Sequence, residues 1–159
     1  MAELSDLPLT HRLFLAAYRF RALDPVPFAR PTKPLAELRL ALVTTGGLSA
    51  PGQVPFDEAF RGGDPSFRLI PGDVDVEALE SHQRSQDFDH SGFDVDRNLA
   101  FPLDRLREMA VRGEVRLAPR HLSVMGSITA PGRLVKESAP AAADLLVADG
   151  VEAALLVPL

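Results

Sequence analysis

The residues best suited to chemistry lie in one polar stretch, residues 81–98, which contains two of the four histidines and four aspartates. The stretch shows neither a helical nor a strand period, so we predict a loop between ordered elements. Loops on a rigid scaffold often carry function, because they present side chains without disturbing the core. The alternative is a solvated loop whose aspartates cap turns and helices.

Two kinds of chemistry suit this stretch. Imidazole and carboxylate groups together bind divalent metals, which makes His82, His90, Asp87 and Asp89 candidate metal ligands. The spacing also imitates the opening of a calcium loop, although the residues that would complete the calcium shell differ from those required. Without a metal, the same four residues are catalytic candidates, in which an aspartate orients a histidine that acts as acid or base.

A second candidate site is the glycine turn Thr45, Gly46 and Gly47, which follows an apolar run. Glycines after a buried strand let backbone N–H groups approach an anionic ligand, and ligands of α/β sheets bind at such strand ends. The alternative is a tight turn with no ligand, since the segment matches no longer glycine motif.

Further polar residues are candidates for substrate binding. Arg68 could bind a carboxylate, or it could equally pair with a local aspartate on the surface. Arg105 is a weaker candidate, because an arginine on a helix face is usually solvated or packs with its stem.

Composition excludes several classes of function. The 159 residues are 46% apolar and carry a formal charge of -5, which suits one compact domain and disfavours nucleic-acid binding. The absence of cysteine excludes thiolate chemistry, disulfides and thiolate metal ligation for this polypeptide. No apolar run reaches the roughly 20 residues that cross a bilayer, and the first residues are acidic rather than basic. We therefore expect a cytoplasmic protein without a membrane partner.

The elements that must position these residues follow from hydrophobic spacing. We predict one domain, in which residues 1–34 form a helix and a proline-rich strap and residues 35–159 form an α/β core. Alternating strands and helices favour a small three-layer fold with a mostly parallel sheet, of the Rossmann or flavodoxin-like type. The helices are expected at 8–23, 76–83, 102–112 and 138–148, and the strands at 38–45, 67–70 and 151–157. Residues 115–117 and 122–128 are expected to form either short strands or loop.

An ordered series of short motifs covers nearly the whole chain from about residue 33 onward. It includes ALVTTGG at 41–47 and GDPSFRLIP at 63–71. The other motifs are at residues 33–35, 55–57, 81–82, 96–98, 101–106, 113–114, 118–121, 125–126 and 149–151. The series resembles the glycine/sarcosine/betaine/D-proline reductase selenoprotein B family.

The resemblance implies an anaerobic reductase component in which selenocysteine, or cysteine in relatives, attacks the substrate after a carbonyl-bearing partner subunit has activated the substrate's amine. That nucleophile would follow the strand that matches residues 153–158, and it is absent from this sequence. The polar positions that match the family's motifs are Thr45, Gly46, Gly47, Asp64, Ser66, His82, Asp96, Asn98 and Arg105.

Three functions are therefore open. The chain could act on or bind a small polar amine or carboxylate through its His/Asp loop, with or without a divalent metal as cofactor. It could be a non-catalytic partner subunit of a reductase complex, or a short form that needs a missing half. We also expect a homo-oligomer, because the apolar strand at 151–157 needs cover for an edge or face.

Overall fold

A computed structural model describes residues 4–18, 22–83 and 90–159. It divides into two compact units, Met1–Arg30 and Pro31–Leu159, which are described separately. That the whole chain forms one domain stays a prediction.

The first unit contains a short 3-10 turn, Leu4–Asp6, and the helix α1, Leu9–Ala17. Neither element buries a residue within the described chain. The helix is shorter than the predicted range 8–23, because the backbone of Tyr18 is already extended and ends it.

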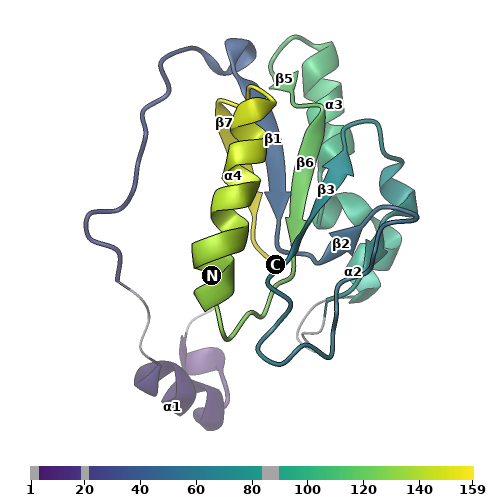
Figure 1. The fold of residues 1–159 in the computed structure, drawn as a ribbon. Helices are drawn as coiled ribbons and strands as arrows, with labels where there is room; N and C mark the ends of the chain where they lie inside the picture. The colour runs from purple at the N-terminus through teal and green to yellow at the C-terminus, as the bar shows by residue number, and fades with distance from the viewer. Residues whose placement is uncertain (1–3, 19–21, 84–89) are drawn as a thin grey trace. The chain divides into compact units, whose positions relative to one another are not determined.

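The second unit is built on a five-stranded sheet whose central strand is β1, Arg39–Thr44 (Figure 1). Three strands run parallel to β1, namely β5 (Arg116–Leu117), β6 (Arg120–Val124) and β7 (Ala153–Val157). The strand β3, Phe67–Pro71, runs antiparallel to β6 at one edge. The prediction of a mixed α/β fold with a mostly parallel sheet is confirmed.

A separate two-stranded ladder joins β2 (Leu48–Ser49) to β4 (Glu80–Ser81). The predicted helix at 76–83 is therefore wrong. Asp75 accepts a hydrogen bond from the Glu77 amide and starts a 3-10 turn, Val76–Ala78, but Leu79 is extended and leads directly into β4. Pairing with β2 satisfies that backbone instead.

Two apolar clusters cover the two faces of β1. Leu40 and Leu42 belong to the cluster that also contains Phe101 and two residues of α3 (Leu103–Val111). Ala41 belongs to the other cluster, together with residues of α4 (Ala139–Ala148). Successive strand residues point to opposite faces, so an uninterrupted apolar run indicates a strand buried on both sides. The finer assignment to a Rossmann or flavodoxin-like type stays a prediction.

The helices predicted at 102–112 and 138–148 are confirmed as α3 and α4. Gly113 follows α3 with a φ of 74°, a conformation that glycine adopts readily and that ends helices. A π-helical turn, Leu134–Ser138, precedes α4. The remaining elements are the short helix α2, His90–Val95, and two 3-10 turns, Leu35–Glu37 and Arg97–Leu99.

Candidate functional site

Polar loops meet where β1, β6 and β7 end. Thr44 is paired with Ser123 of β6 and with Val157 of β7, so the three carboxyl ends lie at one edge of the sheet. The Gly47 amide donates to the Val124 carbonyl at 3.0 Å, and Gly46 forms a bridge with the residue after β6. This edge is where parallel α/β sheets bind ligands.

The glycine turn and His82 lie side by side. The His82 amide donates to the Gly47 carbonyl at 2.9 Å, and Gln83 Nε2 donates to the Thr45 carbonyl at 3.2 Å. The end of the second predicted strand, at Ile70, does not join them. Because β3 is antiparallel, its carboxyl end lies beside the start of β6, and its amino end, near Asp64, belongs to this edge instead.

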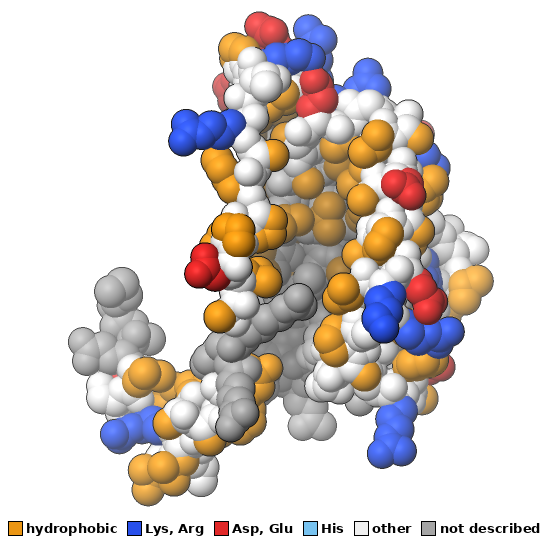
Figure 2. Space-filling model, turned by 60° about the vertical axis from the view of Figure 1, so that its left-hand side comes forward, with side chains coloured by type: hydrophobic (Ala, Val, Ile, Leu, Met, Phe, Trp, Pro, Cys, Tyr) orange, Lys and Arg blue, Asp and Glu red, His pale blue; other side chains and the backbone are white. Residues whose placement is uncertain are grey.

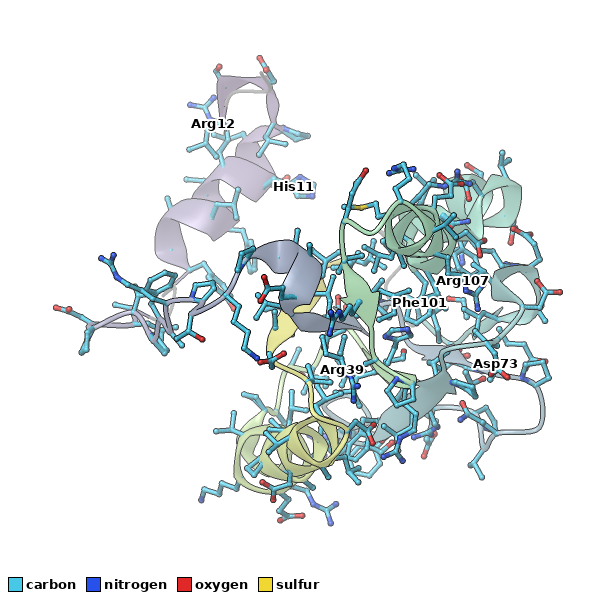
Figure 3. The ribbon with its side chains drawn as sticks, turned by 90° about the horizontal axis from the view of Figure 1, so that it is seen from above. His11, Arg12, Arg39, Asp73, Phe101 and Arg107 are labelled. Atoms are coloured by element: carbon cyan, nitrogen blue, oxygen red, sulfur yellow. The ribbon has the colours of Figure 1, made fainter. Side chains whose placement is uncertain are left out.

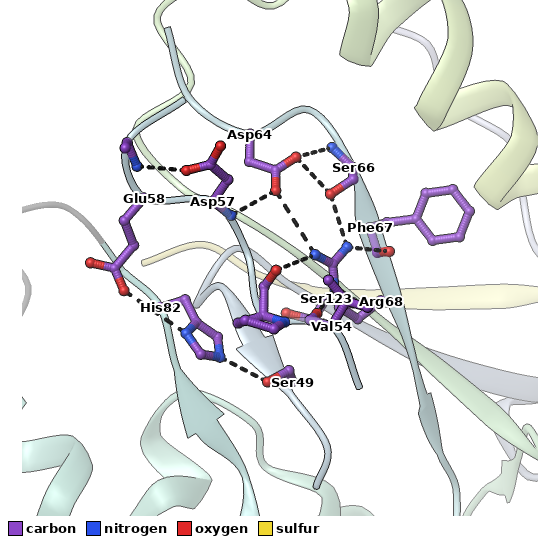
Figure 4. A network of polar contacts seen from close by, with 12 residues as sticks. Ser49, Val54, Asp57, Glu58, Asp64, Ser66, Phe67, Arg68, His82 and Ser123 are labelled. Carbon is purple, nitrogen blue, oxygen red and sulfur yellow. Dashed lines mark hydrogen bonds and ion pairs between the residues drawn. The ribbon is translucent and has the colours of Figure 1, made fainter. Parts of the chain in front are cut away.

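His82 has a polar neighbour at each ring nitrogen (Figure 4). Its Nε2 lies 2.8 Å from Ser49 Oγ, and its Nδ1 lies 3.8 Å from Glu58 Oε1. Ser49 is buried, whereas Glu58 is exposed. The ring of Phe56 lies 6.4 Å from the imidazole. An imidazole that is oriented by a hydroxyl and faces a carboxylate has the parts of an acid–base group.

Asp64 collects hydrogen bonds at the base of the loop that precedes β3. Its carboxylate accepts from the Asp57 amide at 2.9 Å and from both the amide and the hydroxyl of Ser66. Burial alone would raise the pKa of Asp64, but these hydrogen bonds and the charge of Arg68 outweigh it, and the net pKa lies below its usual value.

Arg68 is used within the chain rather than offered to solvent. Its guanidinium donates to the carbonyls of Val54, Pro55 and Phe67 and to the Ser66 hydroxyl, and it lies 4.1 Å from the centre of the Phe56 ring. These bonds close the loop between β2 and β3. Arg68, Val54 and Pro55 are among the residues that line an open depression of the surface. The alternative interpretation of Arg68, pairing with a local aspartate, describes its contact with Asp64 at 3.8 Å.

The glycine turn is also satisfied internally. The Gly46 amide donates to Thr44 Oγ1 at 3.0 Å, and the Gly47 amide has the Val124 partner given above. Thr45 Oγ1 accepts from the Leu159 amide at 2.8 Å. Gly47 has a φ of 62° and a Cβ there would approach the His82 backbone at 3.3 Å, so the turn needs glycine for close packing.

The remaining predicted residues lie near the start of α3. Asp96 accepts from the Asn98 amide, and the Asn98 side chain both accepts from the Asp104 amide and donates to its carboxylate. Arg105 is exposed and pairs with Glu108 at 2.5 Å. This group is connected to the sheet edge through Thr44, whose hydroxyl donates to the Ala100 carbonyl at 2.8 Å.

The metal ligands predicted in the polar stretch are only partly described. His90 is the first residue of α2, whereas Asp87 and Asp89 lie outside the described residues. Within residues 4–18, 22–83 and 90–159, no group of three or more His, Asp or Glu side chains comes together as a metal site. Metal binding by all four residues stays a prediction.

Sequence reasoning missed the two partners of His82. Ser49 lies in an apolar run and Glu58 in a polar loop, and neither has a spacing that connects it with residue 82. The pairing of β2 with β4 brings Ser49 beside His82. The only sequence signal would have been the short strand at 80–81, which was predicted as a helix.

A second histidine is buried in the apolar core. His121 has no exposed surface, and its Nδ1 accepts from the Leu42 amide at 3.1 Å. Its Nε2 has no hydrogen-bond partner among the described residues. Burial, with a smaller contribution from the charge of Arg107, lowers the pKa of His121 to about 4.

Figure 3 shows Phe101 and Arg107 on the face of the sheet that α3 covers. The Phe101 ring lies 6.0 Å from the His121 ring, edge to face. Arg107 donates to the carbonyls of Gly72 and Val74, which ties α3 to the loop after β3. His121 therefore serves the core and not the strand-end edge.

The fold and the edge together define a class: an α/β protein whose polar loops meet at the carboxyl ends of a mostly parallel sheet. The family model described as glycine/sarcosine/betaine reductase selenoprotein B matches residues 8–158. The chain belongs to this family.

Curated relatives support the family assignment. The chain is 35% identical over 137 residues to the D-proline reductase subunit gamma of Acetoanaerobium sticklandii, covering 84% of this chain and 54% of that protein. It is 31% identical over 139 residues to the glycine reductase complex component B subunit gamma of Carboxydothermus hydrogenoformans, covering 85% of this chain and 31% of that protein. The chain thus spans about half of the first relative and about a third of the second.

No solved structure matches the chain. Among the helices of the described residues, none combines the length and the hydropathy needed to span a bilayer.

Proposed function

We propose that the chain is a partner subunit of a selenoprotein B-type reductase complex and that it does not supply the redox nucleophile. The observation that carries the proposal is a contrast: the family pattern runs through residues 8–158, yet the sequence contains no cysteine. Reductive cleavage through sulfur or selenium needs a thiolate or selenolate. The nucleophile therefore lies outside these 159 residues.

The contacts of the candidate binding residues support the same proposal. A free guanidinium would recognise a substrate carboxylate, but Arg68 already has four acceptors in the chain. The amides of Gly46 and Gly47 likewise have partners within the chain. The donors of these loops are therefore used within the chain and do not form an anion site. Such loops suit a scaffold that presents a surface to another subunit.

The names of the relatives favour the reductase setting. One is the gamma subunit of D-proline reductase, and another is the gamma subunit of component B in a glycine reductase complex. We therefore expect the purified chain, supplied with dithiothreitol, to reduce neither D-proline nor glycine, sarcosine or betaine. The same chain, tagged and isolated without oxygen from its native host, should carry a subunit with cysteine or selenocysteine, and that assembly should reduce one of these substrates. Turnover by the chain alone would refute the partner-subunit role.

A second candidate function is favoured by the geometry of His82. In that role the chain binds or acts on a small amine or carboxylate, with His82, His90, Asp87 and Asp89 as catalytic residues or as ligands of a divalent metal. The bond from Ser49 and the approach of Glu58 orient the imidazole for proton transfer.

Replacing His82 with alanine separates the two candidate functions. The change removes the bond to Ser49, so the free energy of unfolding should fall by only about 1 kcal/mol. If the protein binds a metal, its content in elemental analysis should drop in His82→Ala but not in the control His11→Ala. Equal metal content in all three proteins would reject the metal site and leave the partner-subunit role.

A further inference from the structure

The strand β7 is an open sheet edge. Among the described strands it pairs with β1 alone, and its five residues, Ala-Ala-Leu-Leu-Val, contain no charge. Proteins usually protect such an edge with lysine, proline or a bulge, because its free N–H and C=O groups can pair with another chain. An apolar edge without these features is suited to receive a strand.

Apolar side chains surround this edge. Leu155 and Leu156 of β7 are 39% and 67% exposed, and Val147 at the end of α4 is 71% exposed. Figure 2 brings forward the side of the molecule on which Figure 1 shows α4 and β7, and hydrophobic side chains gather there. Leucine side chains exposed beside an unpaired edge are typical of protein interfaces.

The backbone of β7 offers its hydrogen bonds in a regular order. The amide of Thr45, the residue after β1, donates to the Val157 carbonyl at 3.1 Å. Neighbouring residues of a strand direct their N–H and C=O groups to opposite sides. The groups of Ala153, Leu155 and Val157 therefore point toward β1, and those of Ala154 and Leu156 point toward the open edge.

We propose that β7 pairs antiparallel with β7 of a second copy of this chain, about a two-fold axis at Leu155. In this register Ala154 lies opposite Leu156 of the second copy, so a small side chain faces a large one. Ala153 likewise lies opposite Val157. The contact is the same surface on both copies, so it closes as a dimer and leaves no further edge at β7.

Charge favours a second copy despite the net charge of -5. The nearest charged residue, Glu152, is paired with Lys33 at 2.6 Å and also accepts from the Arg39 amide. No like charges then face each other between the two β7 strands. Charge repulsion between the two acidic chains therefore does not act at the contact between their β7 strands.

Sedimentation of the purified chain tests this dimer directly. The parent should sediment at about twice its mass of 17.2 kDa at micromolar concentration. Leu155→Lys should be a monomer, because it places two ammonium groups on the two-fold axis. Val111→Lys, a change at an 88% exposed position of α3, should remain a dimer. A monomeric parent, or a Leu155→Lys protein that sediments as the parent does, would overturn the proposal and leave the edge to another subunit.

Thiol cross-linking tests the register, because the parent has no cysteine. With the Ala154 and Leu156 groups making the hydrogen bonds between the two copies, the two Leu155 residues form a non-hydrogen-bonded antiparallel pair, whose Cα atoms lie about 4.5 Å apart, within the range that a disulfide spans. Leu155→Cys should therefore oxidise to a covalent dimer, while Val111→Cys should not. Equal yields from both variants would contradict the two-fold axis at Leu155. Both tests use the chain alone, so they can fail while the partner-subunit role holds.

Discussion

Replacing Arg68 with alanine is expected to lower the free energy of unfolding by about 3 kcal/mol. The substitution removes the donors that hold the carbonyls of Val54 and Pro55, and it removes the cation that faces Asp64. The Arg68 and Asp64 side chains are only 13% and 11% exposed, so water replaces these contacts poorly. The Phe56 ring also loses the guanidinium packed on its face.

Urea unfolding followed by circular dichroism measures this effect. Arg68→Lys should recover less than half of the loss, because an ammonium cannot reproduce the fork of planar donors. The control Arg105→Ala removes an exposed ion pair and should change stability by less than about 0.5 kcal/mol. If Arg68→Ala and Arg105→Ala unfold at the same urea concentration, Arg68 does not hold the loop.

Acid is expected to destabilise the protein through His121. In the folded state its pKa is about 4, whereas an unfolded histidine titrates near its ordinary 6.5. Between pH 4 and 6.5, His121 thus binds a proton in the unfolded chain but not in the folded chain. Above pH 6.5 His121 does not reduce the free energy of unfolding. As the pH drops from 6.5 toward 4, that free energy falls, by about 3 kcal/mol in total.

Unfolding measured between pH 7 and 5 isolates this effect from the carboxylates, which titrate at lower pH. The imidazole resonances of His121 in the folded protein should remain those of the neutral ring down to pH 5. His121→Gln should be less stable at pH 7, but its stability should fall less steeply with acid than that of the parent. A ring that titrates near pH 6.5 in the folded protein would contradict the burial of His121.

Elements with their own pattern could be predicted from the sequence. The run at 38–45 is apolar throughout, and the helix at 102–112 has one apolar stripe and a glycine stop, so each carries its own signal. The direction of β3 has no such signal, because its residues suit a parallel or an antiparallel strand equally. The segment at 76–83 has a good helix start at Asp75, yet its pairing with β2 overrides that local preference.

The sequence predicted several residues of the candidate site, but it did not predict which residues they contact. The glycine turn and His82 could be identified as candidates from residue type and from the position of the turn at a strand end. The use of Arg68 to close its own loop could not, since its acceptors are backbone carbonyls that any sequence provides. Ser49 could not be identified from the sequence, because no residue pattern connects it with His82. The connection appears only once β4 pairs with β2.

The position of β1 at the centre of the sheet determines when the sheet can form during synthesis. Residue 40 pairs with residues 117 and 153, and among the described strands every sheet neighbour of β1 is made after it. A ribosome therefore exposes an apolar strand early and completes both of its ladders only after more than a hundred further residues. Contacts so distant in sequence slow folding, and an unpaired apolar strand is prone to aggregate in the interval. High-yield production should accordingly depend on slow translation or on chaperones that shield β1 until β7 has been made.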